Sequence, residues 1–221
     1  MPRSTSNHLI TTANSQSPIS EEYRMLRTNI QFSSLDDQMQ VIMIVSAEAG
    51  EGRTTTIGNL AVTYAQEGKR VLLIDTDLRR PSLHDLFHLR NVDGLTNVLA
   101  NKQTWSEVIK DTDVEHLQLM TAGPIPPNPS DMLGSRRLRD LIAELREVYD
   151  VILVDSPPLL AATDGFILSS VCDGVVLVVN AGKAKKENVK KAKASLEKVK
   201  ARILGVVLNN ATRYDAYTAS L

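Results

Sequence analysis

One glycine-rich segment, residues 47–54 with the sequence AEAGEGRT, constrains the fold of this chain more than any other. It follows a short continuous apolar run, VIMIVS (41–46), and precedes a helix-like stretch that ends at Gly68. In length and context the segment matches the phosphate-binding pattern G-x-x-x-x-G-K-[ST]. Glycines in such a loop let backbone N–H groups converge on phosphates at the N-terminus of the next helix. The segment, called here the phosphate loop, therefore predicts a nucleotide site between a buried strand and a helix.

The phosphate loop departs from the pattern at two positions. Ala47 stands for the first glycine, and Arg53 stands for the lysine. A guanidinium is larger, planar and differently aimed than the compact lysine ammonium. We therefore expect nucleotide binding to survive and the rate of phosphoryl transfer to depend on this change. The candidate nucleotide contacts in the loop are Gly50, Glu51, Gly52, Arg53, Thr54 and Thr55.

Further apolar runs alternate with helical patterns along the whole chain. Such alternation predicts an α/β protein of the P-loop NTPase fold, with a mostly parallel sheet and helices on both faces. Ligands of these sheets bind beyond the carboxyl ends of the strands. The expected strands are VIMIVS (41–46), VLLID (71–75), LQLMTAG (117–123), VILVDSPP (151–158), GVVLVVN (174–180) and ILGVVLNN (203–210).

Acidic residues follow two of these runs. Asp75 and Asp77 are two apart in an extended segment, so their side chains point the same way. Asp155 ends another run, where a P-loop protein needs its Walker-B carboxylate. One aspartate after a strand more often forms a turn, but three beside a phosphate loop predict Mg²⁺ binding and proton acceptance. The candidate metal ligands are Thr54, Asp77 and Asp155.

Composition sets limits on the class of protein. A length of 221 residues suits one domain with a full core. The net charge of −1 gives no general attraction to nucleic acid, so no nucleic-acid partner is expected. The single cysteine, Cys172, fits a reducing compartment, and no run is long enough for a membrane helix. We expect a cytoplasmic protein with a mobile arm at 1–18, a P-loop domain at 19–210 and a tail at 211–221.

Three motifs in order resemble those of the bacterial tyrosine kinases of capsule and exopolysaccharide systems. They are the phosphate loop, Asp75-Thr-Asp77-Leu-Arg79, which matches the family motif D-x-D-x-R, and L-V-Asp155-S-P-P. The resemblance extends from about residue 19 to residue 217. It implies a Mg-ATP-dependent kinase that phosphorylates tyrosines, mainly in its own C-terminal tail and across subunits.

The resemblance also implies roles for individual residues. Asp75 is the favoured base for the tyrosine hydroxyl, while Thr54, Asp77 and Asp155 hold Mg²⁺. Arg53 occupies the catalytic lysine position, so the catalytic set is Asp75, Asp77 and Arg53. The expected phosphate acceptors, Tyr214 and Tyr217, form a sparser tail cluster than is typical of the family.

Two kinds of partner follow from the same resemblance. A helix carrying Glu21, Arg24 and Arg27 matches a family motif that assembles subunits into a ring, although a solvated amphipathic helix has the same pattern. A separate transmembrane partner with a cytoplasmic segment would activate the kinase and recruit it to the inner face of the membrane. Other proteins would supply further tyrosine substrates.

Several alternatives stay open. Arg53 and the sparse tail favour a catalytically weak, nucleotide-gated regulatory subunit. A partition-type ATPase would carry a lysine at position 48, where this chain has Glu48. Asn209 either binds the adenine edge or forms a strand-end turn. Arg79, near the phosphate site, either touches a ligand or forms a structural ion pair.

Overall fold

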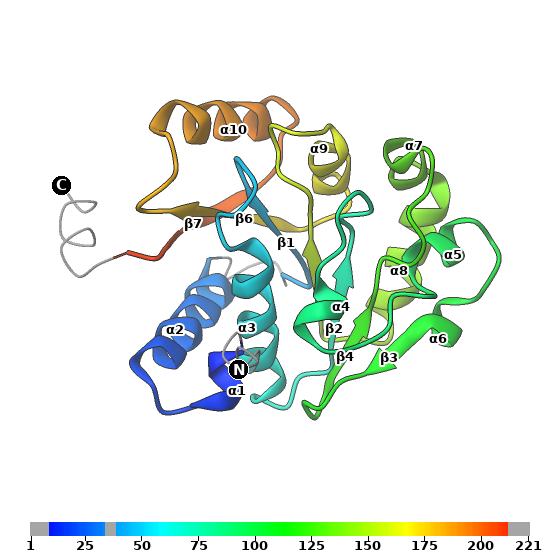
Figure 1. Cartoon of the computed structure of the whole chain (residues 1–221), viewed down its shortest axis with the longest axis horizontal. Helices are drawn as coiled ribbons and strands as arrows, with labels where there is room; N and C mark the ends of the chain where they lie inside the picture. The colour runs from blue at the N-terminus through cyan, green and yellow to red at the C-terminus, as the bar shows by residue number, and fades with distance from the viewer. Residues whose placement is uncertain (1–8, 34–38, 212–221) are drawn as a thin grey trace, which may run out of the picture.

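A seven-stranded sheet forms the centre of the computed structural model, which describes residues 9–33 and 39–211 (Figure 1). The strand order is β3-β4-β2-β5-β1-β6-β7, and only β3 runs antiparallel to its neighbour. The strands are β1 (Val41–Ser46), β2 (Val71–Asp75), β3 (Ile109–Asp111), β4 (Leu117–Met120), β5 (Val151–Asp155), β6 (Gly174–Asn180) and β7 (Ile203–Asn209). The predicted mostly parallel α/β sheet is confirmed.

Helices cover both faces of the sheet, as predicted. Successive side chains of β1 enter opposite faces, so Ile42 and Ile44 lie in one apolar core while Met43 and Val45 lie in the other. The first core contains α2 (Pro18–Phe32), α3 (Arg53–Ala65) and α4 (Leu83–Leu86), and α1 (Ile10–Ala13) packs against α3. The second contains α5 (Leu95–Leu99), α6 (Trp105–Val108), α7 (Pro129–Leu133), α8 (Arg136–Arg146), α9 (Asp164–Ser169) and α10 (Lys186–Lys198).

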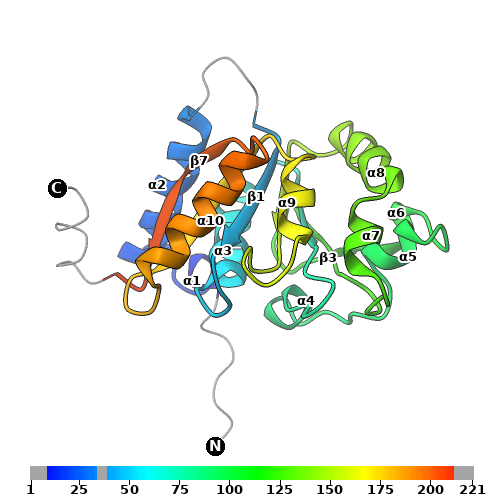
Figure 2. The ribbon, with the colours of Figure 1, turned by 90° about the horizontal axis from the view of Figure 1, so that it is seen from above.

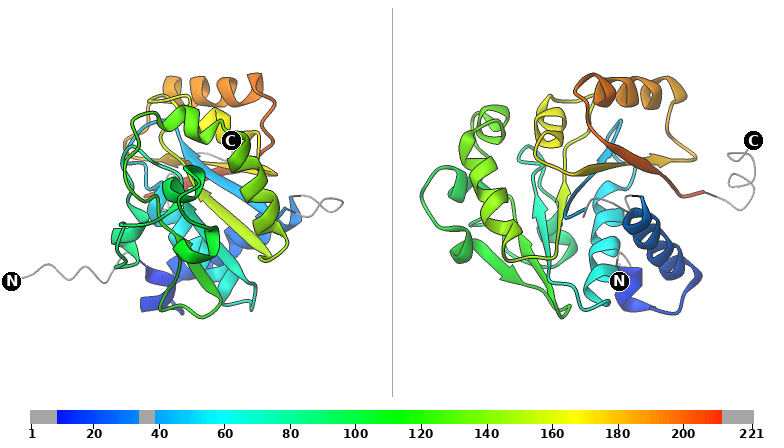
Figure 3. Two further views of the ribbon diagram at one scale, coloured as in Figure 1. Left: turned by 90° about the vertical axis from the view of Figure 1, so that its right-hand side faces the viewer. Right: turned by 180° about the vertical axis from the view of Figure 1, so that it is seen from behind.

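The figures show how α2 and α3 are arranged relative to the sheet. The view from behind shows α2 packed along α3, away from α10 on the opposite face (Figure 3). From above, α2 runs beside the edge strand β7 (Figure 2), where Leu26 shares a core with Leu204 and Val207. No helix in the described part of the chain combines the length and apolar character needed to cross a bilayer.

The carboxyl ends of the central strands meet at one edge of the sheet. Asp75 on β2 pairs in register with Asp155 on β5, and Ile44 on β1 pairs with Asp155 from the other side. The phosphate loop leaves β1 two residues later. Parallel pairing therefore brings the loop and the predicted acidic residues together, although they are far apart in the sequence.

The prediction of a mobile arm over residues 1–18 is wrong for its second half. Residues 10–13 form α1, and Thr11 is buried with its N–H and hydroxyl both donating to Asn59 Oδ1, at 3.1 and 2.9 Å. A polar contact of this kind produces no hydrophobic period, so the sequence pattern concealed it. Helix α2 begins at Pro18, and the Ser17 hydroxyl caps it by accepting a hydrogen bond from Ser20 N.

Candidate active site

The phosphate loop has the backbone shape that its glycines predict. Gly50 and Gly52 have φ angles of 78° and 95°, in the left-handed region that favours glycine. Gly52 is also the N-cap of α3, and a Cβ there would lie 2.0 Å from Asn209 Nδ2. The loop therefore needs glycine at position 52 both for its conformation and for its close contact with the end of β7.

The Glu51 side chain points back into the phosphate loop and holds the start of the loop by hydrogen bonds. Its carboxylate Oε2 accepts from the backbone N–H groups of Ala47 at 3.0 Å and Glu48 at 3.4 Å. The side chain is buried, and this burial raises the pKa of Glu51. The sequence placed Glu51 among the nucleotide contacts. In the structure its side chain holds the start of the loop, which leaves its backbone as the part able to meet a phosphate.

We expect Glu51→Ala to destabilise the protein by about 1–3 kcal/mol, because two backbone donors lose their acceptor. Nucleotide affinity should fall too, since the start of the loop is no longer held. Glu48→Ala is the matched control, because the Glu48 side chain is exposed, and it should change stability by less than about 0.5 kcal/mol. Urea unfolding and nucleotide titration measure both effects. Equal behaviour of the two variants would contradict this role for Glu51.

Arg53 is buried at the start of α3 and binds three groups at the strand ends. Its Nη1 donates to Ser46 Oγ at 2.7 Å, and its Nη2 lies 3.5 Å from Asp77 Oδ2. Its Nε lies 3.7 Å from Asp155 Oδ1. The guanidinium thus directs its charge toward carboxylates of the protein itself. Its three nitrogens reach three different groups, whereas a lysine at this position would have only one ammonium.

Asp75 is completely buried and accepts three backbone hydrogen bonds. Its Oδ2 accepts from the N–H groups of Ser82 and Leu83 at 2.9 and 3.0 Å, and its Oδ1 accepts from Asp77 N at 3.2 Å. Burial and the neighbouring Asp155 raise the pKa of Asp75 to about 8, against the lowering effect of the amides. Asp75 is thus a carboxyl group that holds its proton near neutral pH.

Asp155 and Thr54 are joined by a hydrogen bond between their side chains. Thr54 Oγ1 donates to Asp155 Oδ2 at 2.9 Å and lies 3.0 Å from Ser82 Oγ. Burial raises the pKa of Asp155, and the charge of Arg53 opposes this rise. The other oxygen, Asp155 Oδ1, is buried and has no hydrogen-bond partner among the described residues.

Asp77 is also buried, although it is slightly more exposed to solvent than Asp75 and Asp155. Its Oδ1 accepts from Arg80 N at 3.0 Å, while its Oδ2 faces Arg53. Burial raises the pKa of Asp77, and the amide of Arg80 and the charge of Arg53 lower it. Asp77 and Asp155 therefore both face the Arg53 guanidinium, and Asp75 lies beside Asp155 in the neighbouring strand.

These residues fit Mg²⁺ bound together with a nucleotide. A hydroxyl and carboxylate oxygens are the ligands that Mg²⁺ prefers, and the buried Asp155 Oδ1 has an unused lone pair. Within residues 9–33 and 39–211, no group of three or more His, Cys, Asp or Glu side chains is placed to hold a metal alone. Phosphate oxygens would have to supply further ligands.

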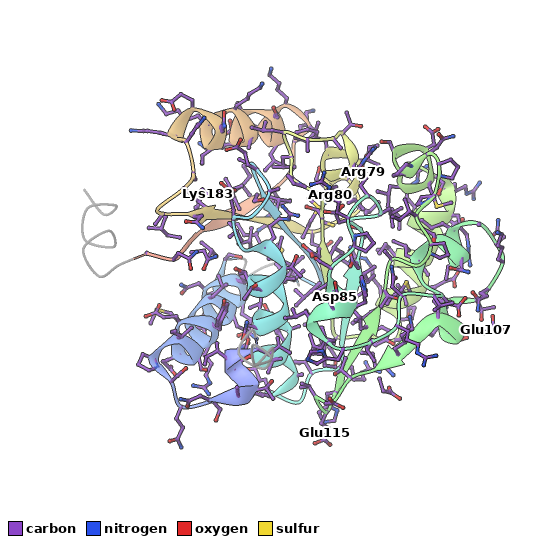
Figure 4. All side chains as sticks on the ribbon, viewed as in Figure 1. Arg79, Arg80, Asp85, Glu107, Glu115 and Lys183 are labelled. Carbon is purple, nitrogen blue, oxygen red and sulfur yellow. The ribbon has the colours of Figure 1, made fainter. Side chains whose placement is uncertain are left out.

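Arg79 forms a structural ion pair, one of the two alternatives for this residue. Its guanidinium meets the fully buried Asp164 twice, at 2.8 and 3.3 Å, and Ser130 Oγ donates to the same carboxylate. Arg79 and Arg80 lie side by side in the loop after β2 (Figure 4). The contact ties that loop to α7 and α9, at the edge of the site.

The remaining predicted residues take contacts within the chain. Asn209 Nδ2 donates to Glu51 O at 2.9 Å, so its amide braces the phosphate loop. Arg24 pairs with Glu21 at 2.7 Å, and Arg27 Nη1 donates to Thr63 O at 2.7 Å. Thr55 is half-buried in the first turn of α3. The tail tyrosines, Tyr214 and Tyr217, lie outside the described residues.

Two residues of the site were missed in the sequence. Ser46 was counted as part of an apolar run, although a hydroxyl at the last position of a buried strand is itself a sign of a polar partner. Ser82 follows an Arg-Arg-Pro turn, where its backbone and hydroxyl reach Asp75 and Thr54. A serine after such a turn and before Leu83 has the position of a helix N-cap, which is the signal that could have drawn attention to it.

The phosphate loop at the carboxyl edge of a parallel sheet, with acidic strand ends beside it, defines a P-loop NTPase. Tyrosine-protein kinase YwqD of Bacillus subtilis (strain 168) is 48% identical over 190 residues, 86% of this chain and 80% of that protein. The chain therefore belongs to the family of bacterial tyrosine kinases.

Other comparisons agree with this assignment. Residues 39–209 match the family described as an AAA domain. Putative tyrosine-protein kinase CapB of Staphylococcus aureus is 42% identical over 194 residues, 88% of this chain and 85% of that protein. The crystal structure of the chimerical protein CapA2B2 superposes with a TM-score of 0.90 at 41% identity, covering 93% of this chain and 91% of that one.

Proposed function

We propose that this protein is a Mg-ATP-dependent tyrosine kinase that phosphorylates Tyr214 and Tyr217 of its own tail across subunits. The observation that carries the proposal is the convergence of the phosphate loop with Asp75, Asp77 and Asp155 in a chain of the tyrosine kinase family. The family resemblance adds that the kinase regulates production of exopolysaccharide or capsule.

Each residue of the site has a role in this proposal. The backbone of the loop and Thr54 hold the nucleotide and Mg²⁺, with Asp77 and Asp155 as further metal ligands. When bound, Mg-ATP supplies the phosphoryl group and positive charge beside it. Asp75 accepts the proton of the tyrosine hydroxyl, a task suited to a carboxyl whose pKa is raised toward neutral pH. Arg53 keeps the carboxylates in place.

The partners and location belong to the same proposal. A transmembrane partner would supply an activating cytoplasmic segment and hold this chain at the inner face of the membrane. Glu21, Arg24 and Arg27 would contribute to a ring of identical subunits, in which Glu21 is the most exposed of the three side chains. Tyrosines of other proteins would be further substrates.

Intact mass after incubation with Mg-ATP tests the kinase directly. The wild-type chain should gain phosphate units, in the presence of a candidate partner's cytoplasmic segment if not alone. The variant with Tyr214→Phe and Tyr217→Phe should gain none if these are the acceptors. Gains that persist in this double variant would leave the kinase standing and move the acceptor elsewhere.

A second function is favoured by the contacts of Arg53, which binds Ser46, Asp77 and Asp155. Because the charge of Arg53 is directed at protein carboxylates, the chain would bind nucleotide but transfer phosphate poorly. It would then act as a nucleotide-gated regulatory subunit. Phosphorylation seen in Arg53→Lys but absent in wild type would identify this alternative. ATP hydrolysis without any tyrosine modification would instead favour a partition-type ATPase.

A further inference from the structure

Lys183 brings a second cation to the phosphate loop (Figure 4). A Cβ built on Gly50 would lie 2.9 Å from Lys183 Nζ, so the ammonium lies against the backbone of the loop. Lys183 belongs to the connection between β6 and α10 and lies more than a hundred residues from the loop in sequence.

The connection that carries Lys183 is held by hydrogen bonds. Asn180 accepts from the N–H groups of Lys183 at 3.1 Å and Ala184 at 2.9 Å, and its side chain accepts from Gly182 N at 3.1 Å. Ala181 N donates to Asn209 O at 2.9 Å, which anchors the turn to β7. The backbone at Lys183 is therefore fixed relative to the same strand end that braces the loop.

The ammonium of Lys183 is available to an anion. Its side chain is exposed, and it forms no ion pair or side-chain hydrogen bond within the described residues. Arg53, in contrast, is nine-tenths buried and is surrounded by protein carboxylates. Arg53, at the usual lysine position, thus pairs with carboxylates of the protein. Lys183, in the β6–α10 connection, faces solvent beside the phosphate loop.

We propose that Lys183 binds the phosphate groups of the nucleotide held by the phosphate loop and takes over part of the task of the missing loop lysine. A compact ammonium forms strong, charge-assisted hydrogen bonds with phosphate oxygens. The inference rests on the proposed nucleotide site but needs no phosphoryl transfer. It assigns to Lys183 a preference for nucleotides with several phosphates over a nucleoside monophosphate.

Nucleotide titration by calorimetry tests this role. Lys183→Gln should weaken Mg-ATP binding by about 10-fold, the order expected for one lost hydrogen bond to a charged group. Binding of AMP should change much less, and Lys183→Arg should restore part of the Mg-ATP affinity. Lys185→Gln is the matched control, because it removes an exposed lysine two residues away. It should leave the affinity within about twofold, because Lys185 belongs to a solvated face.

Equal Mg-ATP affinity of Lys183→Gln and Lys185→Gln would overturn the inference. Thermal unfolding of both variants checks that the fold is kept. If Lys183→Gln binds Mg-ATP more weakly while no variant gains phosphate, the inference stands and the kinase proposal falls. If the wild-type chain binds no nucleotide, both fall.

Discussion

Replacing Arg53 with methionine is expected to destabilise the fold by about 3–5 kcal/mol and to abolish phosphoryl transfer, because it leaves buried carboxylates without their cation. The guanidinium lies between Asp77 and Asp155 and donates to Ser46. Methionine fills much of the same volume, so the loss reports mainly on charge and hydrogen bonding. A site in which Asp77 and Asp155 lack their cation would also hold Mg-ATP in a different place.

The loss caused by Arg53→Met should increase with pH. Burial raises the pKa values of Asp75, Asp77 and Asp155 above 3.8, the value of an ordinary aspartate. Between about pH 4 and pH 8 the folded protein therefore holds protons that the unfolded chain has released, and its stability falls as pH rises. Arg53 limits this fall by favouring the charged form of Asp155. Without Arg53 the fall becomes steeper.

Urea unfolding at pH 5.5 and pH 8, in the absence of nucleotide and Mg²⁺, measures this effect. Arg53→Lys is the control, because it keeps the charge while it loses the planar contacts, and it should fall between wild type and Arg53→Met. An Arg53→Met protein as stable as wild type at pH 8 would show that the guanidinium does not balance these carboxylates.

Asp75→Asn is expected to lower the rate of phosphoryl transfer by about 10²–10⁴, the contribution typical of a positioned general base. The amide has nearly the shape of the carboxyl group but cannot accept a proton. Mg-ATP affinity should change by only a few fold, since the loop and Thr54 stay in place. In wild type the rate should rise with pH toward about 8, as Asp75 loses its proton.

Single-turnover kinetics across this pH range separate the base from a metal ligand. Asp77→Asn should raise the Mg²⁺ concentration needed for activity, whereas Asp75→Asn should lower the maximal rate and flatten its pH dependence. Asp85→Asn, on the exposed side of α4, is the matched control and should keep the wild-type rate (Figure 4). A rate within tenfold of wild type for Asp75→Asn would remove it as the base.

The sheet was predictable because strands buried on both faces require continuous apolar runs, and six such runs occur in the sequence. Strand β3 was missed for the same physical reason. It has three residues, pairs only at the edge with β4, and is partly exposed, so Ile109, Lys110 and Asp111 form no apolar run.

The location of the candidate site was also predictable, but the partner of each side chain was not. Residues after parallel strands must gather at one edge, which placed Asp75 and Asp155 beside the loop. Nothing in the local sequence says that Glu51 turns back onto its own loop or that Arg53 turns toward the strand ends. These orientations depend on neighbours that only the folded sheet supplies. Thr54 shows the same dependence, because it donates a hydrogen bond to Asp155, which is 101 residues away in the sequence.

Long separations within the site have a consequence for the newly made chain. Glu51 and Asn209, which brace each other, are 158 residues apart. At a synthesis rate of about 5–20 residues per second, roughly 8–30 s pass between the emergence of the loop and that of its brace. During this interval the loop exists without Asn209, and for most of it without Asp155. Growing and truncated chains should therefore be catalytically silent, and activity should begin only when the last strand of the domain has joined the sheet.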